Sequence, residues 1–222
     1  MKKILLPLSA LCLLILSAPT LAADPAWLAY ERGDYAKALP AYRQAAQKGK
    51  PLAEYNYAMM LWRGEGTAVD KDNGLLWLRK AAEHHLAQAQ YALGLLYENG
   101  DHLPRSQPDA TQWFLLAARQ GHTAAQTSVA TQYFLGRGAP KDMVQAARWY
   151  EKAAEGGDVG AQYIVATMYE KGDGQPQDLV EAWRWYHAAA LQGDPAAAIR
   201  AHDLGVRLKH AAAASKPAAN VQ

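Results

Sequence analysis

The stretch EAWRWYHAAALQGD, residues 181–194, gathers three aromatic side chains and a histidine within five positions. Trp183, Trp185, Tyr186 and His187 are residue types that can grip a sugar ring, and a histidine can also ligate a metal. A ligand site is usually singular, whereas a packing device in a repetitive chain is reused. Whether the same letters return elsewhere therefore distinguishes a site from a structural element.

The chain aligns with itself at a spacing of 36 residues without gaps. Tryptophans recur at this spacing as Trp77, Trp113, Trp149 and Trp185. Each is followed four residues later by a pair of alanines, such as Ala189 and Ala190. Because one repeat cannot bury its apolar stripe alone, we expect these tryptophans to pack between neighbouring units.

Trp183 is not explained by the repeat. The residues at its register positions are Leu75, Thr111 and Ala147. No shared packing requirement specifies a tryptophan there, so the sequence leaves open whether Trp183 lies on the surface.

Each unit is predicted to contain two helices, which makes the fold class all-α. Residues whose side-chain oxygen can accept a hydrogen bond from the free amides of a helix start recur at the same spacing. They are Asp34, Asp70, Ser106, Asp142 and Asp178. Between Asp178 and Gly193 the apolar residues follow helical spacing, and a glycine suits the helix end. The half of each unit before the cap predicts another helix, as in residues 160–172.

The period divides the chain into an N-terminal helical hairpin at 24–50, repeats, a terminal helix and a tail. The predicted repeats are 51–86, 87–122, 123–158 and 159–194. In the hairpin, Pro40 lies inside the second predicted helix, where it should kink the chain. A capping helix is predicted at 195–210, and a disordered tail at 211–222 because that segment lacks bulky apolar residues.

Residues 1–22 have the features of a secretory signal peptide: two lysines, a short apolar run and small exit residues. We expect cleavage between Ala22 and Ala23, and a periplasmic or secreted bacterial protein. The only cysteine, Cys12, lies in the apolar run. It follows Leu11, where a lipoprotein signal would need a small residue, so lipidation is not expected. The mature chain would contain no disulfide.

Removal of residues 1–22 leaves 21 Lys and Arg against 21 Asp and Glu. This balance argues against nucleic acid or an anionic membrane as the main partner. No later segment is apolar enough to span a membrane.

The sequence displays no catalytic set, cofactor site or metal site. No serine has the context of a nucleophile elbow, and the glycine-containing loops lack the lysine of a phosphate-binding loop. The histidines do not form a pair at helical spacing with a glutamate between them. We therefore expect a non-enzymatic protein without cofactor.

The recurring pattern of small residues, Tyr-x-x-Gly-x-Gly, a cap and Ala-x-x-Trp-Tyr-x-x-Ala-Ala-x-x-Gly resembles the Sel-1-like repeat, a relative of the tetratricopeptide repeat. Residues 133–157 match this pattern best, whereas the second unit has His102 where other loops have glycine. The resemblance implies a right-handed superhelical solenoid of antiparallel helix pairs that holds other proteins, with no catalytic residue. Some cysteine-rich relatives are linked to β-lactam binding, but their disulfides have no counterpart here.

The first helix of each unit carries a variable stripe that faces away from the shared packing positions on a helical wheel. In related solenoids these helices line the concave face, so the stripe is the expected groove for a peptide or another envelope or secreted protein. The candidate residues are Tyr55, Met59, Trp62, Tyr91, Leu95, Glu98, Phe134 and Tyr163. Simple contact of Met59 and Leu95 with adjacent helices is the structural alternative.

Two other function classes stay open. One is a cell-wall or exopolysaccharide factor that binds glycan through Tyr55, Trp62, Tyr91 and Tyr163. The other is a hydrolase of wall or β-lactam substrates. The sequence specifies neither the partner nor the oligomeric state.

Overall fold

The structure is a computed structural model that describes residues 24–214. Every regular element in that range is a helix, which confirms the predicted all-α class. The predicted signal peptide and residues 215–222 lie outside the described range. The helices are α1 (Pro25–Glu31), α2 (Tyr35–Gln47), α3 (Pro51–Arg63), α4 (Lys71–Glu83), α5 (Ala87–Asn99), α6 (Gln107–Arg119), α7 (Thr123–Leu135), α8 (Met143–Glu155), α9 (Val159–Lys171), α10 (Leu179–Leu191) and α11 (Pro195–Ala214).

The second helix of each pair begins directly after the residue that the sequence predicts as its cap. Before α2, α4, α6, α8 and α10, the capping side chain accepts a hydrogen bond from the backbone N–H three residues later, at 3.0–3.3 Å. The caps are Asp34, Asp70, Ser106, Asp142 and Asp178. Each bond satisfies an amide that would otherwise have no partner, and so helps define where the helix starts.

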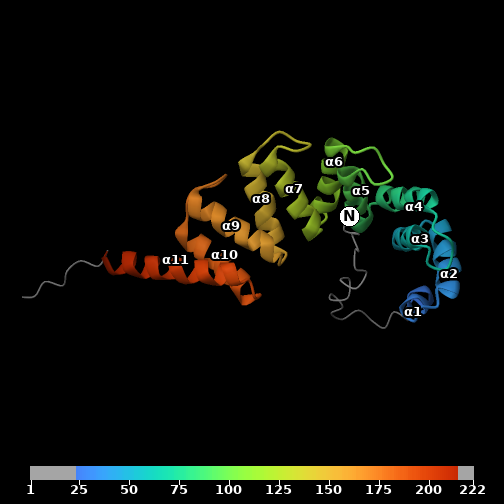
Figure 1. Cartoon of the computed structure of the whole chain (residues 1–222), viewed down its shortest axis with the longest axis horizontal. Helices are drawn as coiled ribbons and strands as arrows, with labels where there is room; N and C mark the ends of the chain where they lie inside the picture. The colour runs from blue at the N-terminus through green and yellow to red at the C-terminus, as the bar shows by residue number, and fades with distance from the viewer. Residues whose placement is uncertain (1–23, 215–222) are drawn as a thin grey trace, which may run out of the picture.

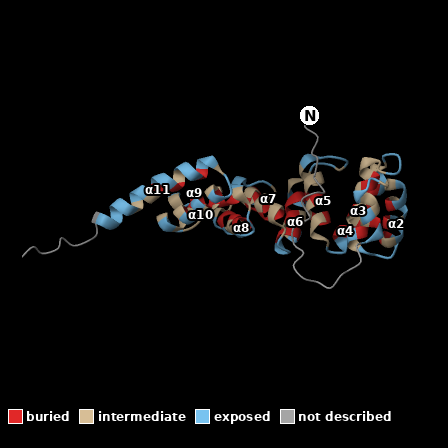
Figure 2. Ribbon diagram, turned by 90° about the horizontal axis from the view of Figure 1, so that it is seen from below, coloured by how far each residue is buried: buried red, intermediate tan, exposed pale blue. Residues whose placement is uncertain are grey.

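The helices follow one another along a curved solenoid (Figure 1). Extensive helix–helix contacts join elements that are consecutive in the chain, from α1 with α2 to α10 with α11. Buried residues are distributed along the whole solenoid (Figure 2), and they form a series of clusters rather than one centre. Each unit therefore depends on its neighbours for its core.

The repeated tryptophans pack between units, as predicted, but they are only half-buried. Trp77, Trp149 and Trp185 each contact two core clusters. The ammonium of Lys80 lies 4.1 Å from the ring centroid of Trp77, and that of Lys152 lies 4.6 Å from Trp149. We call the contact between the second helix of one unit and the first helix of the next a joint. Each indole thus packs at a joint, and in two cases a lysine lies over the ring.

Buried glutamines join successive units. In α5, α7 and α9 the glutamine side chain donates from Nε2 to a backbone carbonyl oxygen at the end of the preceding helix, at 3.1–3.2 Å. The pairs are Gln90 with Ala82, Gln126 with Ala118, and Gln162 with Ala154. The first unit has Glu54 in this register; its side chain is 2% exposed, and its carboxylate lies 2.8 Å from Nδ1 of His84.

The loop of the second unit keeps the backbone conformation of the glycine loops although it has a histidine there. His102 has φ +60°, in the left-handed region also occupied by Gly66, Gly138 and Gly174. The imidazole makes a T-shaped contact with the ring of Trp62, with centroids 5.5 Å apart, and lies 3.5 Å from the carboxylate of Asp72. These contacts accompany a backbone conformation that non-glycine residues rarely adopt.

Two helices continue through positions where the sequence predicted a kink, at Pro40, or a helix end, at residue 210. α2 continues from Tyr35 to Gln47 with Pro40 inside it. The predicted boundary between a helix at 195–210 and a tail at 211–222 is wrong, because α11 extends to Ala214. Alanine is the strongest helix former, so the alanine run prolongs the helix without burying large side chains.

None of the helices described within 24–214 is long and apolar enough to cross a membrane.

Candidate functional site

Consecutive first helices lie side by side. Gln132 of α7 donates from Nε2 to Oε1 of Glu98 in α5 at 2.8 Å, and the hydroxyl of Thr127 in α7 donates to Asp158 before α9 at 3.2 Å. We call the surface that α3, α5, α7 and α9 form the first-helix face. Its predicted partner-binding residues are Tyr55, Met59, Trp62, Tyr91, Leu95, Glu98, Phe134 and Tyr163.

The tyrosines of this set pack against the second helices of their own units. Tyr91 lies between Phe114, at 5.6 Å between ring centroids, and His122, at 4.6 Å. Tyr163 meets the edge of Tyr186 at 5.2 Å. Burial raises the pKa of Tyr91 above its ordinary value. These rings contribute to the core and leave only part of their surface for a partner.

Tyr55 belongs to the same group. It packs against the core cluster that α3, α4 and α5 share, and burial raises the pKa of its hydroxyl. A change of Tyr55 to alanine would therefore disturb packing as well as the surface.

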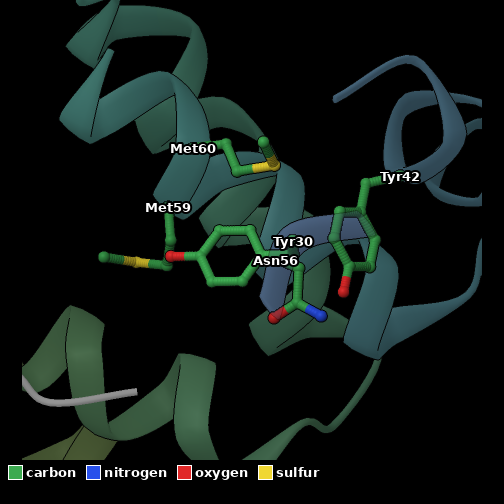
Figure 3. Close-up of a pocket in the computed structure, with 5 residues that line it drawn as sticks. All are labelled: Tyr30, Tyr42, Asn56, Met59 and Met60. Atoms are coloured by element: carbon green, nitrogen blue, oxygen red, sulfur yellow. The ribbon is translucent and has the colours of Figure 1, made fainter. Parts of the chain in front are cut away.

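Met59 and Leu95 also touch neighbouring helices, which is the structural alternative considered for them. Met59 lines a narrow crevice with Asn56 and residues of the N-terminal hairpin (Figure 3). The side chains leave no space there for a water-sized molecule. Leu95 packs on the cluster around Phe114.

The N-terminal hairpin is attached to the first unit by a polar contact that sequence reasoning missed. The hydroxyl of Tyr30 donates to Glu65 at 3.0 Å and accepts from Arg63 at 3.3 Å. Burial and the neighbouring Glu65 raise the pKa of Tyr30 to about 12. The sequence Tyr-Glu-Arg-Gly at 30–33 resembles Tyr-Glu-Asn-Gly at 97–100, but a hydrogen-bond partner 35 residues away in the chain is not visible in such a local pattern.

Trp62 is held at the end of α3, where three segments meet. The ammonium of Lys71 lies 5.0 Å from its ring centroid, and His102 of the next loop meets it edge-on. The ring also approaches the backbone of α4, because a Cβ added to Gly74 would lie 3.4 Å from it. Trp62 is therefore a half-exposed aromatic residue in a defined orientation.

The residues in register with Trp62 differ in chemistry from unit to unit. Phe134 is 38% exposed, with the ammonium of Lys141 at 6.0 Å from its ring centroid. Glu98 is half-buried and accepts from Gln132. Glu170 accepts from Tyr186 at 3.1 Å and pairs with Arg200. This register position thus alternates between aromatic and acidic groups along the face.

The histidine at the start of α7 has a structural role. Among residues 24–214, no group of three or more His, Cys, Asp or Glu is placed to hold a metal ion. His122 instead accepts from the backbone N–H of Ala125 at 3.2 Å as the cap of α7, and burial lowers its pKa, which favours the neutral form that can accept.

Trp183, which the repeat does not explain, is half-buried. Its ring is stacked on His187, with centroids 5.1 Å apart and planes at 8°. It packs against the core cluster that α9, α10 and α11 share.

Comparison with known proteins identifies the repeat. The sequence model of the Sel1 repeat matches residues 51–85, 87–122, 123–158 and 159–194. No curated protein gives a significant match.

Two solved structures share the fold over most of the described chain. A Sel1 repeat protein from Oxalobacter formigenes is 29% identical, with a TM-score of 0.75, over 80% of this chain and 73% of the other. The protein c5321, described as a protective antigen of uropathogenic Escherichia coli with an SLR fold, is 34% identical with a TM-score of 0.73, over 80% of this chain and 39% of the other. The matched repeats make up more than half of the sequence, and the chain belongs to the Sel1 repeat family, whose solenoids are generally non-catalytic scaffolds for protein–protein interaction.

Proposed function

We propose that this protein is an exported, non-enzymatic scaffold that holds an extended segment of another envelope or secreted protein across its first-helix face. The charged start, short apolar run and small exit residues of 1–22 support export. Family membership supports protein binding as the activity. The equal numbers of basic and acidic residues after residue 22 support a protein rather than a nucleic acid as the partner.

The observation that carries the proposal is the register position of Trp62. Packing positions repeat almost unchanged along the chain, whereas this one reads Trp62, Glu98, Phe134 and Glu170. A packing requirement shared by all the units would not produce such different side chains at one register position. An extended partner lying along the face would meet them in turn, and the two aromatic residues offer large contact area with few rotatable bonds to order.

Direct glycan binding is less well supported by the site. A sugar ring binds by stacking on an open aromatic face, and the ring of Trp62 already has Lys71 over it and His102 at its edge. The tyrosines proposed for this role are packed against second helices.

The test is capture of the partner by crosslinking in the native envelope. Changing Trp62 and Phe134 together to alanine should weaken capture at least tenfold, which corresponds to about 1.4 kcal/mol. The matched control changes Leu76 and Val144, exposed apolar residues on second helices of the same two units, to alanine. The control should capture normally. Equal capture by both variants, with unchanged helical signal, would place the partner elsewhere.

Export is tested separately by the intact mass of the protein in the envelope fraction. The expected species begins at Ala23. A chain that keeps Met1, or carries a lipid on Cys12, would contradict the proposed soluble exported form.

A further inference from the structure

A groove of about 390 Å³ lies between α10 and α11, at the C-terminal end of the solenoid. Its apolar part includes Trp183, Gly205 and Val206, and its polar groups are His187, His202 and Lys209. The volume lies toward the lower end of the range of pockets that hold small molecules.

The repeat shows why the groove is open here. In register with Gly205 the other first helices carry Leu61, Tyr97, Tyr133 and Tyr169. Two of these tyrosines reach back to the preceding second helix: Tyr97 accepts from Arg79 at 3.3 Å, and Tyr169 donates to Glu151 at 2.9 Å. The residue in register with Arg79 and Glu151 is His187. At the last joint the tyrosine is replaced by glycine, so no ring reaches back toward His187.

Trp183 forms a flat wall of this space. Its ring is stacked on the imidazole of His187. A Cβ added to Gly205 would lie 3.1 Å from Nε1 of Trp183, so the glycine also makes room for the indole. Both substitutions relative to the repeat, a tryptophan in α10 and a glycine in α11, act on the same groove.

The groove carries donors and a positive charge. Lys209 contributes an ammonium, His187 and His202 contribute ring nitrogens, and none of its lining residues is a carboxylate. The nearby Asp203 is in register with Thr131 and Thr167, which hydrogen-bond second helices of their own units. By this register Asp203 faces the side of α11 away from α10.

We propose that this groove is a second docking site, which receives an aromatic side chain from an acidic segment of a partner protein. At two earlier joints a tyrosine, Tyr97 or Tyr169, reaches the residue that corresponds to His187, so a phenolic ring has the matching chemistry for contact with Trp183 and a hydrogen bond to His187. Acidic residues beside that ring complement Lys209 and the imidazole donors. The site goes beyond the proposed function, because it is separate from the first-helix face and does not require it.

The test uses blocked pentapeptides as probes for the purified protein. The first has a central tyrosine between Asp-Glu and Glu-Asp. The second has alanine in the centre, and the third has tyrosine between lysines. Fluorescence anisotropy of labelled peptides gives Kd, and the indole N–H signal of Trp183 in a heteronuclear NMR spectrum reports where they bind. The acidic tyrosine peptide should shift this signal and bind at least tenfold more tightly than the other two.

The most direct variant restores the residues that the preceding repeat has at the two positions. Trp183→Ala with Gly205→Tyr introduces the residues found at Ala147 and Tyr169, fills the groove with the chain's own ring, and should weaken binding of the acidic tyrosine peptide at least tenfold. Lys209→Glu changes an exposed side chain outside the core and should have the same effect on binding. Leu76→Ala, on a distant second helix, should bind as the unchanged protein does.

Several results would overturn the proposal. Equal affinity for the tyrosine and alanine peptides would exclude an aromatic anchor, and undiminished binding by Lys209→Glu would exclude charge complementarity. A shift of the Trp183 signal by chitohexaose but not by the peptide would make the groove a glycan site. Loss of partner capture in the Trp62 and Phe134 variant would not affect this binding, so the two sites are tested independently.

Discussion

Glu54 places a carboxylate where the later units bury a glutamine. Its side chain is 2% exposed, and His84 is its hydrogen-bond partner at 2.8 Å. In register, Gln90 donates to the carbonyl of Ala82 and accepts from Gln120. A carboxylate can only accept hydrogen bonds, so Glu54 cannot donate to a backbone carbonyl as Gln90 does.

We therefore expect Glu54→Gln to stabilise the protein at neutral pH by about 1 kcal/mol. The neutral amide avoids a buried charge, can donate to the carbonyl of Ala46, and can still accept from the Nδ1–H tautomer of His84. Urea denaturation measures the change.

The reciprocal substitution is the control for this prediction. Gln162 donates to Ala154 and accepts from Gln192. Gln162→Glu should destabilise by about 1–3 kcal/mol, because it removes the donor and buries a charge. If both substitutions shift stability in the same direction, the glutamine contact is not what joins the units.

At the scale of elements, the loop after a first helix rests on the start of the preceding second helix. A Cβ on Gly174 would overlap the carbonyl of Met143, and Gly174 has φ +74°. Gly193, after α10, has φ +93° but no atom within 4 Å of such a Cβ. Substitutions at these two glycines therefore distinguish the cost of backbone strain alone from the cost of strain together with a steric clash.

Gly193→Ala should cost about 1 kcal/mol for the left-handed conformation alone. Gly174→Ala should cost more, about 3 kcal/mol, since the loop must also move away from α8. Chemical denaturation of the two variants gives the difference. Equal losses would mean that the loop does not depend on its contact with the neighbouring unit.

At the scale of the whole molecule, the extensive contacts join consecutive helices, so we expect a destabilising substitution to affect only the neighbouring helices. Leu204 of α11 is 2% exposed and packs with Ala182 and Tyr186 of α10. Leu204→Ala should destabilise this end by about 2–5 kcal/mol, while α3 to α6 share no cluster with it.

Amide hydrogen exchange read by mass spectrometry tests this expectation. Protection should fall in α9, α10 and α11 and stay unchanged in α3 to α6. Thr111→Val, at a buried site in α6, provides a perturbation in the middle of the solenoid for comparison. A uniform loss of protection after Leu204→Ala would show that the solenoid unfolds as one unit.

The sequence by itself determined the architecture. A period of 36 residues, a capping side chain before each second helix and helical spacing of apolar residues specify helix pairs that stack. These signals are local or periodic, so they can be read without coordinates. The same reasoning placed the repeated tryptophans between units, and failed at Ala211, where an alanine run prolongs a helix without needing a core.

Only the tertiary structure decided which variable residues are free to meet a partner. Tyr91 and Trp62 look alike in sequence as members of one exposed stripe, but Tyr91 packs between Phe114 and His122, whereas Trp62 lies at a junction with Lys71 and His102. The groove beside Trp183 likewise depends on Gly205, which lies on another helix. A helical wheel gives the direction of a side chain on its own helix, while exposure depends on what the adjacent helices bring against it.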